Sequence, residues 1–412
     1  MTFHDFNLDP RIMAGIAAQD YIHPTPIQQA AIPDVLAGRD VLGVAQTGTG
    51  KTAAFMLPII HNLLARKDRR VRALVIAPTR ELAEQICLAT RDFARQTGLR
   101  TLAVYGGVGK QQQAQKLRRG VEIVVACPGR LLDIHDDGDI DLSSVETVVL
   151  DEADRMFDMG FLPDLRRILH LLPVHRQNLF FSATMPPEIR RLADGILVDP
   201  AIATIDAQAP AATVTHAVYP TNEALKNSLL VALLREKRRE RTLVFTRTKY
   251  RARNLAKVLN YQGHRVIALE GNMPQSKRQA AIDGFRKGRY DVLVATDVAA
   301  RGIDVVDIET VINYDMPETL ESYTHRVGRT GRAQKTGEAV NLALVADTPL
   351  VQEIGTIQGE PVEQCVLDGF DYGEFRPRLY IAPAAPTPEP RRRRGLGARR
   401  ARRSTRRPAR RV

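Results

Sequence analysis

Short apolar runs alternate with amphipathic stretches along most of this 412-residue chain, and this alternation restricts the fold more than any other feature. Each run has the length of one buried strand, and the stretches between runs have the pattern of helices of about 10 to 15 residues. The runs form two series, at 41–45, 73–77, 121–126, 145–150 and 178–181 and then at 242–245, 265–269, 291–295, 310–313 and 339–345. The pattern predicts an α/β protein with two parallel sheets, each covered by helices on both faces.

Two segments fit neither series. Residues 199–220 are rich in Ala, Pro and Thr and carry little charge, which is typical of a connector between domains. From Asp368 onward Gly, Pro and Arg dominate, and the stretch APAAPTPEP at 382–390 is typical of an extended, semi-rigid spacer. The domains we expect are a first lobe at 1–205, a flexible linker at 206–215, a second lobe at 216–368 and a disordered basic tail at 369–412.

The excess positive charge lies in that tail. The chain has 59 Lys and Arg against 47 Asp and Glu, and residues 391–412 contain twelve arginines and no acid. Without these arginines the chain is formally neutral. Charge runs at termini are often merely solubilising, but arginine also binds phosphate bidentately and stacks on unpaired bases, so we expect a tethering arm for nucleic acid.

Several classes of protein are disfavoured by composition. The three cysteines are odd in number and lack CxxC spacing, which argues against a disulfide framework or a zinc site. A hydrophobic fraction of 44% with 26% charged residues is typical of a soluble globular chain, and no apolar run approaches the roughly 18 residues of a membrane span. The first residues carry acids instead of a basic secretory leader. We expect a cytoplasmic, monomeric protein without membrane contact.

A glycine-rich octet, AQTGTGKT at 45–52, lies between the first apolar run and a helical stretch. Its backbone N–H groups can surround phosphate oxygens at the start of a helix, its lysine can reach the β- and γ-phosphates, and its last hydroxyl can bind Mg²⁺. An ordinary strand-to-helix turn is the alternative. The residues expected to bind ATP here are Gln46, Thr47, Gly48, Thr49, Gly50, Lys51 and Thr52.

Acidic residues follow the apolar run that ends at Leu150. Carboxylates just after a buried parallel strand lie at the edge of the sheet where ligands bind. We therefore expect Asp151 to hold Mg²⁺ and Glu152 to polarise the attacking water. The alternative is that these are two acids in an ordinary solvated turn. The apolar strand before them and the phosphate loop upstream argue against that alternative.

Further motifs accompany these two. The series is PTPIQ at 24–28, AQTGTGKT, PTRELA at 78–83, GG at 106–107, PGR at 128–130, DEAD at 151–154, SAT at 182–184, Phe245, QSKR at 275–278, ATDVAARGID at 295–304 and HRVGRTGR at 325–332. Over residues 3–368 the chain resembles the DEAD-box ATP-dependent RNA helicases, and within them the bacterial RhlE-like branch. The resemblance implies two RecA-like lobes, ATP and Mg²⁺ as cofactors, and RNA as partner.

The resemblance also implies roles for individual residues. Gln28 would read adenine, Phe3 would stack on the base and Asp304 would touch the ribose, although Phe3 as a hydrophobic staple of the first helix is nearly as well supported. Arg329 and Arg332 would act as arginine fingers on the γ-phosphate. The residues implied in coupling the lobes are Asp154, Ser182, Thr184 and His325.

RNA contacts are implied on both lobes, at Arg80, Gly107, Arg130, Arg247, Arg278, Thr296 and Gly302. Such contacts read phosphate and 2′-OH groups and select no sequence. The predicted activity is local unwinding of short RNA duplexes or remodelling of RNA–protein complexes driven by ATP hydrolysis, in ribosome assembly or RNA decay. An ATP-gated RNA clamp with little unwinding is the main alternative, and a DNA translocase is a weaker one.

Three positions depart from the family pattern. Asp20 stands where the family usually has Gly, and Cys127 replaces the Thr that usually precedes PGR. Glu270 stands before Gly271 where His is expected. The Cys127 change removes a hydroxyl contact to phosphate but leaves the backbone N–H groups of the helix start. The sequence does not indicate what Glu270 does.

Overall fold

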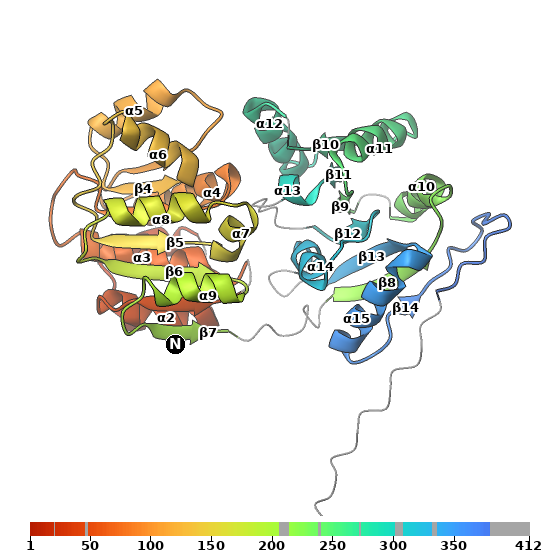
Figure 1. The fold of residues 1–412 in the computed structure, drawn as a ribbon, viewed down its shortest axis with the longest axis horizontal. Helices are drawn as coiled ribbons and strands as arrows, with labels where there is room; N and C mark the ends of the chain where they lie inside the picture. Colours follow the sequence, from red (N-terminus) through yellow and green to blue (C-terminus); the bar gives the residue numbers. More distant parts are fainter. Residues whose placement is uncertain are drawn as a thin grey trace, which may run out of the picture. The chain divides into compact units, whose positions relative to one another are not determined.

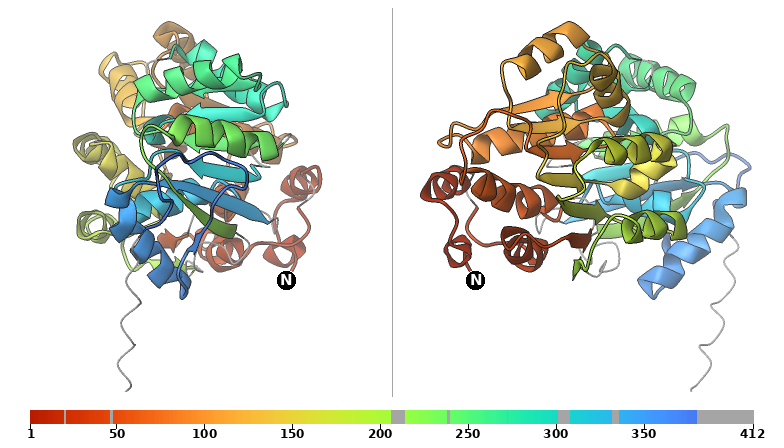
Figure 2. Two further views of the ribbon diagram at one scale, coloured as in Figure 1. Left: turned by 90° about the vertical axis from the view of Figure 1, so that its right-hand side faces the viewer. Right: turned by 60° about the vertical axis from the view of Figure 1, so that its left-hand side comes forward.

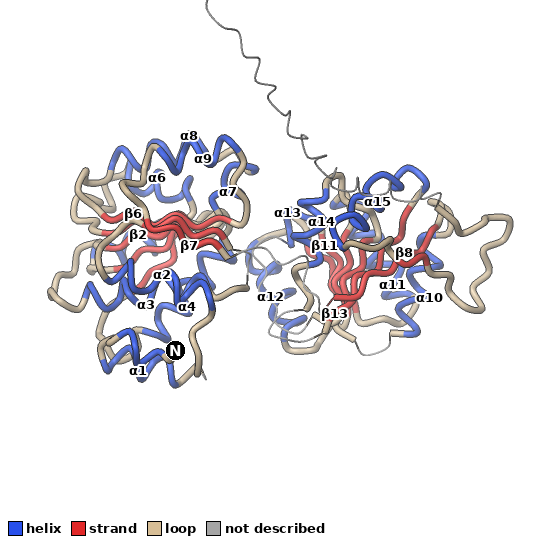
Figure 3. The backbone as a smooth tube through the Cα atoms, turned by 90° about the horizontal axis from the view of Figure 1, so that it is seen from below, coloured by secondary structure: helices blue, strands red, loops and turns tan. Residues whose placement is uncertain are grey.

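The computed structural model describes residues 1–19, 21–45, 48–205, 214–237, 240–271, 273–300, 308–331 and 336–379. Within these residues the chain forms two seven-stranded parallel sheets, one in each half of the sequence (Figures 1 and 3). The strand order is β3-β4-β2-β5-β6-β1-β7 in the first sheet and β10-β11-β9-β12-β13-β8-β14 in the second. The expected fold class, two parallel-sheet α/β lobes, is confirmed.

The strands of the first sheet are β1 Val41–Val44, β2 Ala73–Ile76, β3 Thr101–Val104, β4 Ile123–Ala126, β5 Thr147–Leu150, β6 Gln177–Ser182 and β7 Ala201–Thr204. Those of the second are β8 Val214–Pro220, β9 Thr242–Phe245, β10 Val266–Leu269, β11 Val292–Ala295, β12 Thr310–Asn313, β13 Gly337–Ala343 and β14 Glu363–Gln364.

The helices of the first lobe are α1 Pro10–Ala17, α2 Pro26–Leu36, α3 Lys51–Leu63, α4 Arg80–Phe93, α5 Lys110–Arg118, α6 Pro128–Asp136, α7 Ala153–Asp158, α8 Leu162–Leu171 and α9 Pro187–Asp194. Those of the second are α10 Lys226–Glu236, α11 Lys249–Tyr261, α12 Gln275–Arg286, α13 Asp297–Ala300, α14 Leu320–Val327 and α15 Thr348–Gln358. Short 3₁₀ helices cover Phe3–Phe6 and Val345–Asp347.

Helices cover both faces of each sheet because neighbouring strand residues point to opposite faces (Figure 2). In β2, Ala73 and Val75 join the core beneath α2, α3 and α4, whereas Leu74 and Ile76 join the core beneath α6, α8 and α9. The second lobe has the same arrangement, with α10 and α11 on one face and α12 and α13 on the other. The continuous apolar runs of the sequence therefore reflect burial on two faces.

Every apolar run of the sequence coincides with a strand, but four strands were not expected. β3 is one, and β7, β8 and β14 are the others. β7 and β8 correct the interpretation of 199–220 as a connector, because β7 pairs with β1 and β8 pairs with β13. The predicted linker at 206–215 also needs correction, because 214 and 215 are the first residues of β8. Residues 206–213 lie outside the described residues.

The boundary expected after Asp368 also needs correction. Phe370 and Tyr372 pack against the core of the second lobe, and Leu379 is buried. The Leu379 N–H donates to Oε1 of Gln364 at 2.9 Å, and its carbonyl accepts from Nε2 of the same side chain at 3.3 Å. Residues 369–379 therefore belong to the second lobe, and the rest of the predicted tail, 380–412, lies outside the described residues.

Gly43 in β1 is a packing requirement of the first lobe. A Cβ at this position would lie 2.4 Å from the ring of Phe181, which packs against Phe55 with ring centroids 5.3 Å apart. We expect Gly43→Ala to lower the free energy of unfolding by about 1–3 kcal/mol, because overpacking forces a buried ring from its position. Chemical denaturation measures the change. Gly129→Ala is the matched control, since nothing lies within 4 Å of a Cβ there, and a destabilisation equal to that of Gly43→Ala would contradict the packing argument.

Candidate active site

Sheet order brings the sequence motifs together in two groups. In the first sheet β5, β6 and β1 are neighbours, so the acidic motif after β5, the SAT motif at the end of β6 and the glycine-rich loop after β1 share one edge. The strands β3, β4 and β2 form the other half of that sheet, and GG, PGR and PTRELA follow them. The candidate ATP residues and the candidate RNA residues of the first lobe therefore lie along the same carboxyl edge, in different halves of the sheet.

The glycine-rich loop leads directly into α3. Gly48 and Gly50 have φ values of +87° and +92°, a region that favours glycine, and Gly50 is the N-cap residue of α3. Lys51 is buried, and its Nζ donates to the Ala45 carbonyl at 3.0 Å and lies 4.0 Å from Oδ1 of Asp151. Gln46 and Thr47 lie outside the described residues. The loop therefore presents one buried ammonium group and the start of a 13-residue helix at the same point.

Gln28 is buried beside this loop. Its Oε1 accepts from the Thr25 N–H at 2.9 Å, and its Nε2 donates to the Gly50 carbonyl at 3.1 Å. A Cβ on Gly50 would lie 2.4 Å from that Nε2. The amide thus links the start of α2 to the phosphate loop.

Phe3 lies in the core of the first lobe. It is 2% exposed, and its ring contacts Phe6 and Tyr21 with centroids 6.1 and 6.3 Å apart. Tyr21, which the sequence did not single out, is 43% exposed. The packing alternative for Phe3 is the one that this geometry supports, and Tyr21 is the more accessible aromatic ring of this cluster.

The acidic motif is buried. Asp151 and Glu152 are 2% and 3% exposed, and Glu152 adopts φ 54° and ψ 52°, a left-handed conformation that costs a non-glycine residue roughly 1–3 kcal/mol. Oε2 of Glu152 accepts from Nη1 of Arg155 at 2.6 Å. Burial raises the pKa of the Asp151 carboxyl, although Lys51 opposes the shift. Burial also acts on Glu152, but Arg155, Lys51 and Arg329 outweigh it and lower the pKa of that carboxyl, which keeps it ionised.

Asp154 connects the acidic motif to the SAT motif. Its Oδ2 accepts from the N–H groups of Ala183 and Thr184 at 3.1 and 2.8 Å and lies 3.0 Å from the Thr184 hydroxyl, while its own N–H donates to Oγ of Ser182 at 3.2 Å. The Thr184 hydroxyl also lies 3.2 Å from Oε1 of Glu321 in α14. One hydroxyl proton can serve only one of the two carboxylates at a time, so Thr184 can exchange partners between the lobes.

The HRVGRTGR segment contains arginines in different surroundings. Arg326 is satisfied within its own lobe: Nε and Nη2 donate to Asp297 at 2.6 and 2.7 Å, and Nη1 donates to Asn313 and to the Asp315 carbonyl. Arg329 is buried and close enough to Glu152 to lower its pKa. Arg332 lies outside the described residues, as do Gly302 and Asp304.

His325 lies beside the acidic motif of the first lobe. Burial, with a contribution from Arg155, lowers the pKa of His325 to about 4, so the imidazole is neutral at pH 7. One ligand atom each of His325, Asp154 and Glu321 lie within 4.8 Å of one another. The residues expected to couple the lobes are therefore brought together around Asp154.

Two candidate RNA residues of the first lobe, Arg80 and Arg130, line a cavity of about 390 Å³ that also includes residues of the second lobe. Gly107 has φ +83°, which favours glycine, and a Cβ there would lie 2.1 Å from Nη1 of Arg80, so a larger residue would displace that guanidinium. Arg80 Nη1 donates to Oε1 of Gln275 at 3.2 Å, and Arg130 Nη1 donates to the Val108 carbonyl at 3.1 Å. Both arginines thus border the cavity.

The second lobe contributes Arg278 to the same cavity. Its Nε is hydrogen-bonded and ion-paired with Glu81 of the PTRELA motif, and its Nη2 donates to the Ala299 carbonyl at 2.6 Å. Thr296 is buried, and Arg247 is exposed at the end of β9, where its backbone N–H donates to Asp315 at 2.9 Å. The structure thus places Arg278 in one cavity with the candidate RNA residues Arg80 and Arg130 of the first lobe.

Comparison with known proteins extends these observations. A family model described as DEAD/DEAH box helicase matches residues 25–192, and one described as helicase conserved C-terminal domain matches residues 225–334. ATP-dependent RNA helicase CshA of Listeria monocytogenes is 43% identical over 378 residues, which cover 91% of this chain and 72% of CshA. The chain belongs to the DEAD-box ATP-dependent RNA helicase family.

Other relatives of this DEAD-box chain include a longer protein and a solved complex. The human probable ATP-dependent RNA helicase DDX23 is 39% identical over 400 residues, and this chain spans about half (49%) of its length. The structure of Saccharomyces cerevisiae Dbp5 bound to RNA and ADP BeF3 has a TM-score of 0.77 at 30% identity and covers 88% of this chain and 94% of Dbp5. Family membership and fold are thus supported by sequence and by structure.

Two departures from the DEAD-box pattern have a structural explanation. Glu270 is 3% exposed, and both Nε and Nη2 of Arg253 donate to its Oε1. Burial raises the pKa of the Cys127 thiol to about 12, so it stays a neutral thiol at the N-cap of α6 and offers no capping hydrogen bond. Asp20 lies outside the described residues. The hydrogen bonds between Arg253 and Glu270 connect α11 to the end of β10, beside Gly271.

Sequence reasoning missed Arg155 and Glu321. Arg155 is 4% exposed and holds Glu152, and Glu321 faces Thr184 from the other lobe. Arg155 could have been predicted from its position directly after the DEAD motif, because a basic residue three positions after a buried acid can form an ion pair with it. Glu321 gave no such signal, since its partner is 137 residues away.

Proposed function

We propose that this protein is an ATP-dependent RNA helicase that closes its two lobes on ATP and single-stranded RNA and separates short duplexes locally or remodels RNA–protein complexes. One observation carries the proposal: hydrogen bonds connect the acidic motif beside the phosphate loop to Ser182 and Thr184, and Thr184 reaches Glu321 of the other lobe. A nucleotide at the phosphate loop therefore has a physical path to the residues of the second lobe.

The nucleotide chemistry follows from the buried groups. Lys51 and the start of α3 would hold the β- and γ-phosphates. Glu152, ionised and held by Arg155, would orient and polarise the attacking water. Arg329, with Arg332 as the second predicted finger, would stabilise charge that develops on the γ-phosphate, and Asp304 would bind the ribose.

Mg²⁺ is expected with ATP, and the residues fit it. Thr52 offers a hydroxyl in the first turn of α3, and Asp151 offers a buried carboxylate at the neighbouring edge of the same sheet. Such hard oxygen donors are what Mg²⁺ prefers. The ion, when bound, neutralises phosphate charge. The 4.0 Å separation of Lys51 Nζ and Asp151 Oδ1 is that of a loose ion pair, which leaves carboxylate oxygens able to bind a cation.

RNA binding would use the cavity that Arg80, Arg130 and Arg278 line, together with Gly107 beside the Arg80 guanidinium. Arginine side chains and backbone groups there would contact phosphate and 2′-OH groups without reading base edges. The exposed Arg247, together with Thr296 and Gly302, would continue the contact on the second lobe. The Dbp5 complex with RNA supports this use of the fold.

ATP hydrolysis rates with RNA, with DNA and without nucleic acid test the proposal, combined with unwinding of a short RNA duplex. We expect stimulation by RNA and not by DNA, and ATP-dependent strand separation. RNA stimulation without unwinding would favour the ATP-gated clamp, and equal stimulation by single-stranded DNA would favour a DNA translocase. No stimulation by either would overturn the proposal.

The finer assignments rest on the same resemblance. We propose an RhlE-like protein that acts as a cytoplasmic monomer in ribosome assembly or RNA decay. Bacterial relatives such as CshA support a bacterial type of helicase. Within the described residues, no helix combines the length and the apolar character of a membrane span. Light scattering and the sedimentation of the protein with ribosomal particles or decay complexes test these assignments.

We expect the arginine segment 391–412 to add affinity for RNA without taking part in hydrolysis. If about half of its twelve arginines bind single-stranded RNA, removal should flatten the slope of log affinity against log salt by roughly 4. Stopping the chain after Leu379 makes the test while keeping the packed residues 369–379. A chain that stops after Pro390 is the control and should behave the same, because it loses the arginines alone. An unchanged slope would refute the tether, and a collapsed maximal ATPase rate would show that the segment belongs to the catalytic cycle.

A further inference from the structure

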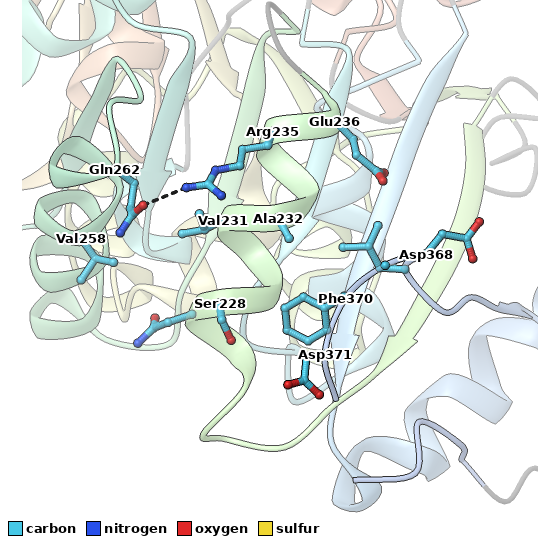
Figure 4. Close-up of a pocket in the computed structure, with 13 residues that line it drawn as sticks. Ser228, Val231, Ala232, Arg235, Glu236, Val258, Gln262, Asp368, Phe370 and Asp371 are labelled. Atoms are coloured by element: carbon cyan, nitrogen blue, oxygen red, sulfur yellow. Dashed lines mark hydrogen bonds between the residues drawn. The ribbon is translucent and has the colours of Figure 1, made fainter. Parts of the chain in front are cut away.

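A pocket of about 620 Å³ lies on the second lobe between α10, α11 and the C-terminal segment after β14. None of the residues that line it belongs to the predicted ATP or RNA residues. Val231, Ala232, Val258 and Leu367 provide apolar walls. The ring of Phe370 lies beside α10 (Figure 4). It is half-buried and contacts Tyr372, with ring centroids 4.8 Å apart. The proposed function leaves this pocket without a role.

The rim of the pocket is acidic. Glu236, Asp368 and Asp371 line it and are exposed, whereas the cation among the lining residues, Arg235, donates to Gln262 at 3.0 Å (Figure 4). Glu236 is the last residue of α10, where the carbonyl end of the helix adds negative potential. Carboxylates beside an aromatic ring form the surroundings that a guanidinium group favours, because it pairs with the acids and stacks on the ring.

We propose that this pocket is the docking site of the chain's own arginine segment, residues 391–412. The segment has the complementary chemistry: its twelve arginines are accompanied by no acid, and Leu396 stands in the sequence RRRRGLGARR with arginines on both sides. A leucine flanked by arginines matches an apolar floor with an acidic rim. The segment also has a fixed origin, since Leu379 is hydrogen-bonded to Gln364.

The origin lies close to the pocket. Gln364 and Leu367 are three residues apart, which is at most about 11 Å of chain. The eleven residues between Leu379 and Arg391 can span about 40 Å when extended, so the segment reaches the pocket without strain. A short tether gives an effective concentration of about 1 mM. Exposed ion pairs contribute only about 0.2–1 kcal/mol each, so the docked state is reversible and weakened by salt.

Trypsin cleavage of the full chain tests the docking, because trypsin cuts after arginine. The comparison is with the triple variant Glu236→Gln, Asp368→Asn and Asp371→Asn. At low salt we expect trypsin to cleave the segment about threefold to fivefold more slowly in the natural chain than in this variant. This ratio corresponds to a dissociation constant of about 0.3 mM for the docked state at a tether concentration of about 1 mM. High salt should remove the difference. The control variant Glu318→Gln, Glu353→Gln and Glu360→Gln changes the net charge equally at exposed positions outside the pocket and should cleave like the natural chain.

A second measurement uses p-benzoylphenylalanine in place of Leu396 in the full chain. Irradiation should crosslink this position to α10 or to residues 367–371 of the same molecule, with a yield independent of protein concentration. Equal cleavage of the natural chain and the triple variant, or crosslinks that map elsewhere, would overturn the proposal. Crosslinked dimers whose yield rises with concentration would overturn it in favour of a second copy as the source of the segment.

Discussion

Glu152→Gln is expected to slow ATP hydrolysis by about 10² to 10⁴ while leaving ATP and RNA binding intact. The amide keeps the shape of the carboxylate and can still accept from Arg155, but it has too little basicity to polarise water. The buried site retains its packing, since both side chains have the same size. The variant should therefore accumulate with both ligands bound. Single-turnover hydrolysis and equilibrium binding of a fluorescent nucleotide measure the two effects separately.

Asp158→Asn is the matched control, because it makes the same acid-to-amide change at an exposed position in α7, the helix that begins directly after Glu152. Its hydrolysis rate should stay within a few-fold of the natural protein. A Glu152→Gln rate in that same range would remove Glu152 from its role.

Arg329→Ala is expected to lower RNA-stimulated hydrolysis by about 10³ to 10⁵ with nucleotide affinity largely retained. The guanidinium acts on charge that develops in the transition state, so its loss affects kcat more than ground-state binding. Arg329 also helps to lower the pKa of Glu152, and its removal takes away that support. Arg329→Lys keeps the charge but not the planar fork, so it should recover only part of the rate.

The neighbouring Arg326→Ala gives a contrasting control. Arg326 is bonded to Asp297, Asn313 and the Asp315 carbonyl within its own lobe. Its loss should lower the free energy of unfolding by about 1–3 kcal/mol, because the buried Asn313 side chain and the Asp315 carbonyl lose their donor. Arg329→Ala should retain more stability than Arg326→Ala. If Arg329→Ala instead lost nucleotide binding in parallel with turnover, Arg329 would be a ground-state ligand and not a finger.

The sequence predicted the strands that are buried on both faces, because four or more consecutive apolar residues have few other structures available. It failed at the edge strands of the first sheet and at a strand whose burial is partial. β3 is a short edge strand, and β7 lies at the opposite edge with Ile202 exposed, so neither has a long apolar run. β8 alternates in burial, and it was hidden in a segment whose Ala, Pro and Thr content indicated a connector.

The site could be predicted in part for a related reason. Motifs at the carboxyl ends of parallel strands must share a sheet edge, so the group of Lys51, Asp151 and Ser182 follows from the order of motifs and the fold class. The partners of each arginine in the HRVGRTGR motif do not follow from the local sequence. Arg326 and Arg329 are three residues apart in one motif. Arg326 is hydrogen-bonded within its own lobe, whereas Arg329 lies near Glu152.

The sequence by itself therefore determined the two-lobed α/β fold, the family and the edges that carry the chemistry, because these depend on local periodicity and on motifs of adjacent residues. The tertiary structure decided what depends on distant partners. It buried Phe3 against Tyr21, paired Glu270 with Arg253 and placed Glu321 beside Thr184. It also extended the second lobe to Leu379, because burial and hydrogen bonds with Gln364 stabilise a segment whose composition alone is that of a tail.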